Sequence, residues 1–426
     1  MQYYMVYSLA IGTIRCGMAM DYLQRGLEAE LTLAAQSFPA VVLSGPRQVG
    51  KTTLLQHLFS ATHQYVSLDD PAIRTLAVQD PRGFLDLYRP PVIFDEIQAV
   101  PSLLPYLKVR IDEDRKRMGQ YLLTGSQNLL LMESVTESLA GRAAYLRMWP
   151  MAQRELDQNL GRLLPWEATT LVNELSSPYG RKLAFCERLL IGGYPDAALA
   201  DPAVRRQWFA SYIHTYLERD VRQLRNVGDL SQFQNFIKAV ALRSGQMLNM
   251  SDVARDLGLA VNTVKAWISN LEVSGLVIVL RPYFENMGKR MVKTPKVYFT
   301  DTGLLCHLTD MQTAEQLALS PFGGGVMETA VVMETIKALS FHGKSQNLYF
   351  WRTSNGAEVD LVIEHNGKLM PVEAKLSATP KLSMASGIQA FKQTYGDRSG
   401  TGWVVYSGDQ LLPLGNQVVA VPFRRY

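Results

Sequence analysis

The sequence of 426 residues predicts an α/β fold in which helices wind around a parallel sheet, followed by a helix-turn-helix and a second α/β unit. Three observations predict the first part. A glycine-rich loop at residues 45–53 joins an apolar strand, 39–43, to a helix, 53–59. Further short apolar runs end in acidic or small polar residues, and helical segments separate them. Such runs are typical of parallel strands that are buried on both faces.

The loop has the G-x-x-x-x-G-K-T spacing of a phosphate loop, in which backbone N–H groups and a helix N-terminus point at phosphates. We expect Lys51 to reach the β- and γ-phosphates of ATP and the Thr52 hydroxyl to ligate Mg²⁺. A simple glycine turn would need neither residue. The residues expected to contact the nucleotide are Gly45, Pro46, Arg47, Gln48, Val49, Gly50, Lys51, Thr52 and Thr53.

The elements around this loop follow in regular alternation. A helix is expected over about residues 23–37, and others over 72–79 and 103–116. Strands are expected at 65–70, 90–96 and 120–126. Because ligands of wound sheets bind beyond the carboxyl ends of the strands, residues there are candidates for the site.

Asp95 and Glu96 end the 90–96 strand, about 45 residues after Lys51. They suit a Walker B pair, in which Asp95 holds the water shell of Mg²⁺ and Glu96 orients the attacking water. The alternative is an acidic dipeptide that begins a solvated turn.

Ser126 (or Asn128) is a candidate sensor of the γ-phosphate, although a serine after glycine also forms turns. Arg142 is a candidate arginine finger that would act on a neighbouring subunit, and a surface arginine is the alternative. Arg219 and Arg222, in a charged run over 218–222, are other finger candidates. A finger that acts in trans requires an oligomer.

Residues 236–280 and 296–299 predict a helix-turn-helix with a two-stranded wing. Helices are expected over 236–242, 249–258 and 262–273, with strands at 275–280 and 296–299. Val261, Val264, Ile268 and Leu271 would form the buried stripe of the third helix. The candidate DNA contacts are Asn262 and Lys265 on its outer face, and Lys289, Arg290 and Lys293 on the wing. A packing module that binds no DNA is the alternative.

The last segment suggests a second site. Gly323, Gly324 and Gly325 are expected to break the chain before a helix, 326–340, that carries Glu328. Strands are expected at 347–352, 357–364 and 368–376. Asp360, Glu373 and Lys375 would converge there, with Glu328 in support, on a divalent cation and an activated water. The alternative is a cross-strand ion pair.

Bulk properties narrow the class of protein. The chain is 47% apolar and 19% charged, with a net charge of +4, which permits nucleic-acid binding without requiring it. Its three cysteines form no C-x-x-C pair, so zinc and disulfide frameworks are not indicated and a reducing cytoplasm fits. No apolar run has the length of a membrane span. Met18 or Met20 is a candidate start, which would leave the preceding residues as an extension.

From about Met20 the chain resembles the bacterial and archaeal ATPases that join an AAA-type domain to a C-terminal domain of unknown function, DUF4143. The resemblance implies a relationship to AAA+ ATPases of the origin-recognition type, which also carry a winged helix. It further implies a restriction-endonuclease-like, PD-(D/E)XK fold for the C-terminus, with Asp360, Glu373 and Lys375 at its catalytic places. Besides the phosphate loop, the matching segments are 123–127, 139–142, 216–221, 298–304, 351–352, 358–360 and 372–375.

We therefore expect an N-terminal extension (1–19), a P-loop ATPase domain (20–160), a helical lid or linker (161–230), a winged helix (231–305) and a nuclease-like domain (306–426). The function expected is ATP hydrolysis with Mg²⁺ by a cytoplasmic homo-oligomer, of which a hexamer is one form. This oligomer would bind duplex or branched DNA and remodel or cleave it. The alternative is an ATP-operated regulatory switch that binds a protein partner and cleaves no DNA.

Overall fold

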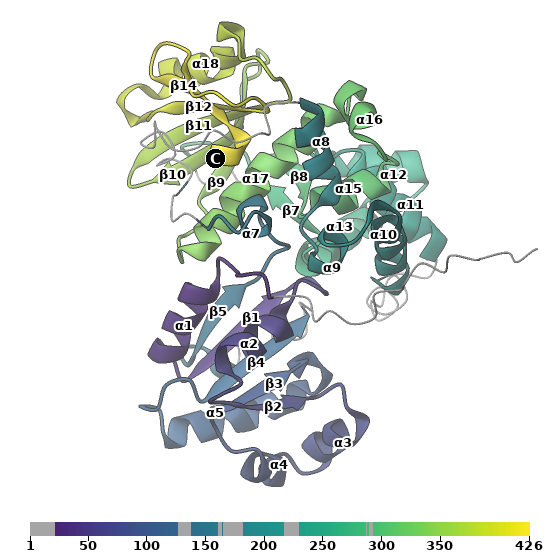
Figure 1. The fold of residues 1–426 in the computed structure, drawn as a ribbon, viewed down its shortest axis with the longest axis vertical. Coiled ribbons are helices and arrows are strands. Elements are labelled where there is room, and N and C mark those ends of the chain that lie inside the picture. Colours follow the sequence, from purple (N-terminus) through teal and green to yellow (C-terminus); the bar gives the residue numbers. More distant parts are fainter. Residues whose placement is uncertain are drawn as a thin grey trace, which may run out of the picture.

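The computed structural model describes residues 22–126, 138–160, 164, 182–216, 230–286, 288 and 293–426. These residues form three sheets surrounded by helices. In Figure 1 a five-stranded sheet lies at the bottom and a six-stranded sheet at the top, with a mainly helical region between and beside them. Among the described residues, none of the helices combines the length and the apolar character that a membrane-spanning segment needs.

The first sheet has five parallel strands in the order β2-β3-β4-β1-β5. They are β1 (Ala40–Gly45), β2 (Gln64–Ser67), β3 (Val92–Asp95), β4 (Tyr121–Ser126) and β5 (Ala143–Arg147). The alternation of strands and helices in the sequence predicts the first four and their parallel arrangement. The edge strand β5 was not predicted from the sequence, and its side chains are only partly buried.

Helices cover both faces of this sheet, and the inner strands β1 and β3 are buried on both sides. Val41 and Leu43 of β1 join one apolar core, whereas Ala40 and Val42 join another. Because the strands are parallel, all their carboxyl ends lie at one edge of the sheet. The helices are α1 (Glu28–Ser37), α2 (Lys51–Phe59), α3 (Pro71–Gln79), α4 (Pro81–Leu87), η1 (Ile97–Ala99), η2 (Pro101–Leu103) and α5 (Leu104–Glu113).

A helical region follows the first sheet and includes residues from two distant parts of the sequence. Its helices are α7 (Gln153–Leu156), α8 (Lys182–Ile191), α9 (Pro195–Ala198), α10 (Pro202–Tyr216), α15 (Thr302–Leu308) and α16 (Ala314–Leu319). Both α15 and α16 pack against α8. The domain boundary expected at residue 306 falls inside α15. Asp301, which caps α15, also accepts the N–H of Gly193, 108 positions away in the chain. Local sequence gives no sign of a contact between such distant residues.

Three helices and a small antiparallel sheet, in the order β6-β8-β7, form the next unit. Asn249 caps the second helix by accepting the N–H groups of Ser251 and Asp252, and Gly258 ends it with a φ of 66°. The elements are α11 (Leu230–Ala241), β6 (Gln246–Met247), α12 (Met250–Leu257), α13 (Val261–Val273), β7 (Val277–Leu280) and β8 (Lys296–Phe299).

The buried stripe of α13 differs from the expected one at one position. Val261 is 37% exposed at the first turn, where the helix projects from its neighbours, and the large ring of Trp267 is buried instead. Val264, Ile268 and Leu271 are buried as expected. Asn262, Lys265 and Ser269 are exposed.

The second large sheet has six strands in the order β13-β14-β12-β11-β10-β9. Strands β9, β10 and β11 are antiparallel, and β11, β12 and β14 are parallel. The elements are α17 (Gly323–Phe341), β9 (Leu348–Arg352), β10 (Glu358–His365), β11 (Lys368–Lys375), η5 (Leu382–Ala385), α18 (Ser386–Tyr395), η6 (Gly396–Arg398), β12 (Gly402–Tyr406), β13 (Leu412–Pro413), β14 (Val418–Pro422) and η7 (Phe423–Arg425).

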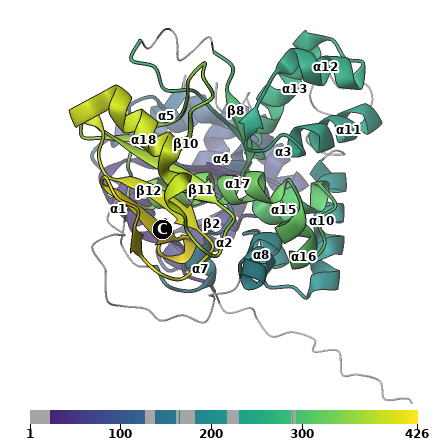
Figure 2. The same ribbon diagram turned by 90° about the horizontal axis from the view of Figure 1, so that it is seen from above.

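The expectation that residues 323–325 break the chain is wrong, because these three glycines form the first turn of α17. Packing requires the small size of Gly323 and Gly325. A Cβ atom on Gly323 would lie 2.5 Å from the carbonyl oxygen of Leu317, and one on Gly325 would lie 2.7 Å from that of Ser244. Figure 2 shows α17 between the six-stranded sheet and α15, and it also contacts α1, α8 and β8.

Candidate functional site

The phosphate loop turns tightly between β1 and α2. Gly45 has a φ of 147°, and Gly50, with a φ of 91°, stands directly before the helix. A Cβ atom on Gly45 would lie 2.1 Å from the carbonyl oxygen of Met148, so a side chain has no room here. The buried Lys51 ammonium donates to the carbonyls of Gly45 (3.0 Å) and Pro46 (2.7 Å). The loop thus presents a cation at a helix N-terminus, which favours a bound anion.

Asp95, the last residue of β3, ties this loop to the neighbouring strands. Its buried carboxylate accepts the Thr52 hydroxyl at 3.0 and 3.1 Å and the Tyr65 hydroxyl at 2.8 Å, and Thr124 of β4 donates to it as well. Burial and the Asp95 carboxylate raise the pKa of Tyr65 to about 12, so its phenol stays a donor at neutral pH. Sequence reasoning missed Tyr65 and Thr124, whose contacts depend on the order of the strands.

The oxygen ligands beside the phosphate loop suit Mg²⁺, which prefers hydroxyl and carboxylate oxygens. Thr52 and Asp95, the two residues expected to share the ion, lie side by side. Glu96 follows Asp95 in a left-handed conformation with a φ of 57°, which is uncommon for a residue with a side chain. Its carboxylate accepts a hydrogen bond from Gln98. Ser126 ends β4 at the same edge, but its side chain and Asn128 lie outside the described residues.

A cavity of about 510 Å³ opens beside these groups. Arg47, Lys51, Thr52 and Glu96 line its polar part. Of the expected loop contacts, Gly45, Pro46 and Val49 are not among the lining residues, and the Val49 side chain is buried in the core. The apolar part is lined by Tyr22, Leu23, Met151, Pro195 and Leu199. The volume is within the usual range of sites for small ligands and cofactors.

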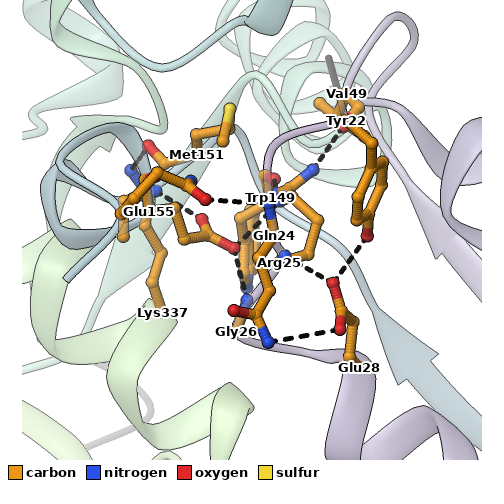
Figure 3. Close-up of polar contacts among 12 residues, drawn as sticks. Tyr22, Gln24, Arg25, Gly26, Glu28, Val49, Trp149, Met151, Glu155 and Lys337 are labelled. Atoms are coloured by element: carbon orange, nitrogen blue, oxygen red, sulfur yellow. Dashed lines mark hydrogen bonds and ion pairs between the residues drawn. The ribbon is translucent and has the colours of Figure 1, made fainter. Parts of the chain in front are cut away.

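Arg25 joins the segment before α1 to the phosphate loop, as Figure 3 shows. Its guanidinium donates to the carbonyls of Val49 (2.7 Å) and Trp149 (2.9 Å) and forms an ion pair with Glu155 at 2.9 Å. The side chains of Arg25 and Glu155 are 6% and 1% exposed. This pair was not predicted from the sequence, because its members are 130 positions apart in the chain.

Helix α17 approaches the same region from the other side. Lys337 donates to the carbonyl of Met151 at 3.0 Å, and the carboxylate of Glu334 accepts the N–H of Gln153 at 3.1 Å. Lys337 and Met151 appear beside Glu155 in Figure 3. The cavity wall at Met151 is therefore held by the helix that leads into the six-stranded sheet.

Arg142 lies away from the phosphate loop. Its carbonyl accepts the N–H of Ala40 at the start of β1, whereas the loop follows the end of that strand. Its guanidinium pairs with both carboxylate oxygens of Asp112, at 2.7 and 2.8 Å. Arg142 thus has no contact with the cavity of its own chain. Arg219 and Arg222 lie outside the described residues.

A second cavity, of about 520 Å³, lies between α13 and the small sheet. Lys265 of α13 and Arg281 and Lys293 beside the strands bring positive charge to it, together with Ser269 and one acid, Glu272. Asn262 is exposed on α13 but does not line this cavity. Lys289 and Arg290 lie outside the described residues.

The unit that carries this cavity rests on the phosphate loop. Gly275, in the turn after α13, lies against Pro46. Arg147 of β5 stacks on Trp149, 4.0 Å from its ring centre, and donates to the carbonyl of Glu272 at 3.3 Å.

In the six-stranded sheet, Asp360, Glu373 and Lys375 converge as the sequence suggests. The Lys375 ammonium contacts the Glu373 carboxylate at 2.9 Å, and Asp360 accepts the N–H of Ala374 at 2.9 Å. Burial, followed by the charge of Asp360, raises the pKa of Glu373 well above its ordinary value.

Glu328 faces the same cluster, but a residue that sequence reasoning missed lies with it. Lys296 of β8 contacts Glu328 at 2.8 Å, Glu358 at 2.5 Å and Asp360 at 3.9 Å. Burial, followed by Asp360, raises the pKa of Glu328 to about 8. In the described part of the chain, no group of three or more His, Cys, Asp or Glu side chains is arranged to hold a metal ion. The expected metal set of Glu328, Asp360 and Glu373 is therefore not assembled, because an ammonium lies among the carboxylates.

Comparisons with known proteins match most of the chain. A family model described as "AAA domain" matches residues 37–157, and one described as "Domain of unknown function (DUF4143)" matches residues 323–426. Between them, "Domain of unknown function (DUF8612)" matches residues 182–315. This last range extends beyond residue 306, in keeping with the packing of α15 on α8.

The chain is 29% identical, over 403 residues, to uncharacterized proteins Rv2008c of Mycobacterium tuberculosis and Mb2031c of Mycobacterium bovis. These matches cover 94% of this chain and 83% of the relatives. Among solved structures it is similar to a Walker-type ATPase of Pyrococcus abyssi, with 18% identity, a TM-score of 0.41, and coverage of 68% of this chain and 96% of that one. The chain is thus similar to AAA domains over residues 37–157 and to DUF4143 domains over residues 323–426, in keeping with its motifs.

Proposed function

We propose that the protein hydrolyses ATP in the cavity beside the phosphate loop. The triphosphate would lie over the N-terminus of α2, where Lys51 would exchange its bonds to the carbonyls of Gly45 and Pro46 for the β- and γ-phosphates. The adenosine would occupy the apolar part, between Tyr22 and Leu23 on one side and Met151, Pro195 and Leu199 on the other.

Thr52 and Asp95 would hold Mg²⁺, which neutralises charge on the β- and γ-phosphates when bound. Tyr65 and Thr124 keep the Asp95 carboxylate in place through their hydroxyl groups. Glu96 lines the cavity and would accept a proton from the attacking water. This arrangement is the single observation that carries the proposal.

We further propose that residues 230–299 form a winged helix that binds DNA through the positively charged cavity beside α13. Three helices followed by an antiparallel sheet favour this fold. Lys265, Arg281 and Lys293 would contact phosphates, so binding would depend strongly on salt and weakly on sequence. Because Gly275 lies against Pro46, nucleotide in the phosphate loop would alter how α13 is held.

The proposal includes self-association. Since Arg142 is directed away from the cavity of its own chain, its use as an arginine finger would require a second subunit. Arg219 and Arg222 remain alternatives for this role.

The carboxyl-terminal sheet, with α17 and α18, is proposed to have a restriction-endonuclease-like fold. The carboxylates and Lys375 are in suitable strands, but Lys296 occupies the centre of the acidic cluster. DNA cleavage is therefore the activity that the geometry supports least. This observation favours a second candidate, an ATP-operated switch that uses this domain to bind a partner protein and cleaves no DNA.

A DNA-panel ATPase assay tests the proposal. Duplex, single-stranded and branched DNA are added in turn to the purified protein with ATP and Mg²⁺ at low salt. A DNA-dependent ATPase is stimulated by at least one of these DNAs, whereas the protein-binding switch is indifferent to all. Absence of any turnover that Lys51→Ala removes would refute the catalytic role of the phosphate loop.

A further inference from the structure

One residue of the three-stranded sheet completes the polar core of the six-stranded sheet. Lys296 begins β8, yet its ammonium contacts Glu328 of α17 and Glu358 and Asp360 of β10. Only 3% of Lys296 is exposed. Tyr298 lies on the same side of β8 and donates to Glu328 at 2.6 Å. Strand β8 therefore directs both a cation and a hydroxyl donor into the acidic cluster.

The charges of the cluster explain why the ammonium is held there. Burial lowers the pKa of Lys296, but Glu328, Asp360 and Glu358 together outweigh it and raise the pKa above its ordinary value. Removing one partner of such a buried group leaves charges without compensation, which is costly. The second lysine, Lys375, is 36% exposed and contacts Glu373 instead, so it does not replace Lys296.

The position of Lys296 is fixed by the backbone. In the register of the small sheet it lies opposite Met247 of β6 on one side and Leu280 of β7 on the other. At the other end of β8, the N–H of Phe299 donates to the Ser244 hydroxyl at 3.1 Å. The Cα atom of Lys296 is therefore held in place beside α17 and β10, within reach of the acidic cluster.

We propose that Lys296 is the built-in counter-ion of this cluster, so that its carboxylates hold an ammonium in place of a divalent cation. The carboxyl-terminal sheet then has no nuclease-type metal site while β8 is in position. This proposal differs from the sequence-based prediction, in which Asp360, Glu373 and Lys375 form a metal site. It holds whether or not the phosphate loop hydrolyses ATP.

Binding of Mn²⁺ to the full-length, nucleotide-free protein tests this inference by electron paramagnetic resonance. The wild type should show no Mn²⁺ binding that Asp360→Asn removes. Lys296→Met should create one additional site and strengthen binding by about tenfold or more, and Asp360→Asn should abolish that gain. Lys344→Met is the matched control, since it removes an exposed lysine three positions after the end of α17 and should leave binding at the wild-type level.

Lys296→Met is expected to weaken folding, so a double variant accompanies it. Lys296→Met with Glu328→Gln removes the ammonium together with the acidic group it contacts at 2.8 Å, and retains Glu358, Asp360 and Glu373. It should also gain a site that depends on Asp360. Two results would overturn the inference: Asp360-dependent binding of Mn²⁺ by the wild type, or no gain in whichever variant folds.

Discussion

Gly275, in the turn after α13, lies so close to Pro46 of the phosphate loop that a Cβ atom on it would be 2.8 Å from the Pro46 Cγ atom. The same Cβ would lie 3.2 Å from a guanidinium nitrogen of Arg147. The helix that lines the positively charged cavity thus ends against the loop that would hold the triphosphate. This contact predicts that the two cavities influence each other.

Gly275→Ala should weaken this coupling. The new methyl group would push α13 away from Pro46, and a φ of 77° adds backbone strain, so the expected loss in unfolding free energy is about 1–3 kcal/mol. Any stimulation of ATPase by DNA should fall as well. Gly258→Ala is the matched control, because Gly258 has a φ of 66° but no atom within 4 Å of its Cβ position. Equal effects of the two substitutions on DNA stimulation would contradict the coupling.

Lys51→Ala and Glu96→Gln should both remove ATP turnover, by about 10²-fold to 10⁴-fold. Their effects on nucleotide binding should differ. Lys51→Ala should weaken nucleotide binding, because it removes a positive charge beside the phosphates. Glu96→Gln should leave binding nearly unchanged, because it keeps the shape of the cavity and removes only the proton acceptor. A steady-state phosphate-release assay with a fluorescent-nucleotide titration separates them. If Glu96→Gln still turned over at the wild-type rate, Glu96 would not be the catalytic acid–base group.

Arg25→Met should destabilise the protein by about 3–5 kcal/mol, since it leaves the buried carboxylate of Glu155 without its cation. Arg25→Met with Glu155→Met should recover part of this loss, because both charges are then removed. Arg255→Met offers a control in an exposed pair with Asp252, where 74% and 44% of the side chains are accessible, and should cost about 0–1 kcal/mol. Urea unfolding measures these three variants and Glu155→Met alone. A double variant as unstable as the sum of its singles would argue against a coupled pair.

The carboxyl of Glu328 predicts a pH dependence of stability. Its pKa is 4.5 ordinarily and about 8 in the folded protein, chiefly through burial and then through Asp360. Across this window the folded protein holds a proton that the unfolded chain releases, so rising pH favours unfolding. The difference in unfolding free energy between the wild type and Glu328→Gln should therefore decrease from about pH 5 to pH 8. Urea titrations at several pH values measure it, and a difference that increased with pH would have the wrong sign.

Lys265→Ala and Lys293→Ala should weaken DNA binding similarly for all sequences. Each lost phosphate contact should reduce the slope of log affinity against log salt by about 1. Filter binding at several salt concentrations gives this slope. Lys116→Ala removes an exposed lysine from the five-stranded layer and should leave the slope unchanged. Equal losses at Lys116 would show that binding follows overall charge and not the cavity beside α13.

Local sequence predicts the elements of this fold well where the signal is local. The phosphate loop and the acidic end of β3 each depend on neighbouring residues, and the structure has them close to the expected positions. The AAA and DUF4143 resemblance is confirmed by the family matches.

Contacts between distant segments were not predictable in the same way. Tyr65 reaches Asp95 only because β2 pairs with β3, and Arg25 meets Glu155 only when α7 folds back on α1. Lys296 looks from the sequence like an ordinary first residue of a strand, and its acidic partners lie 32 to 64 positions later. A period of two or of 3.6 residues carries no information about such partners.

Helix α17 gives the molecule a mechanical property. Glu328, at the acidic cluster, and Glu334, which anchors Gln153 near the nucleotide cavity, are separated by only about 9 Å along one continuous axis. An intact α-helix transmits a shift or a rotation along its length with little loss. A displacement of the wall at Met151 that shifted α17 would therefore shift the Glu328 carboxylate with it.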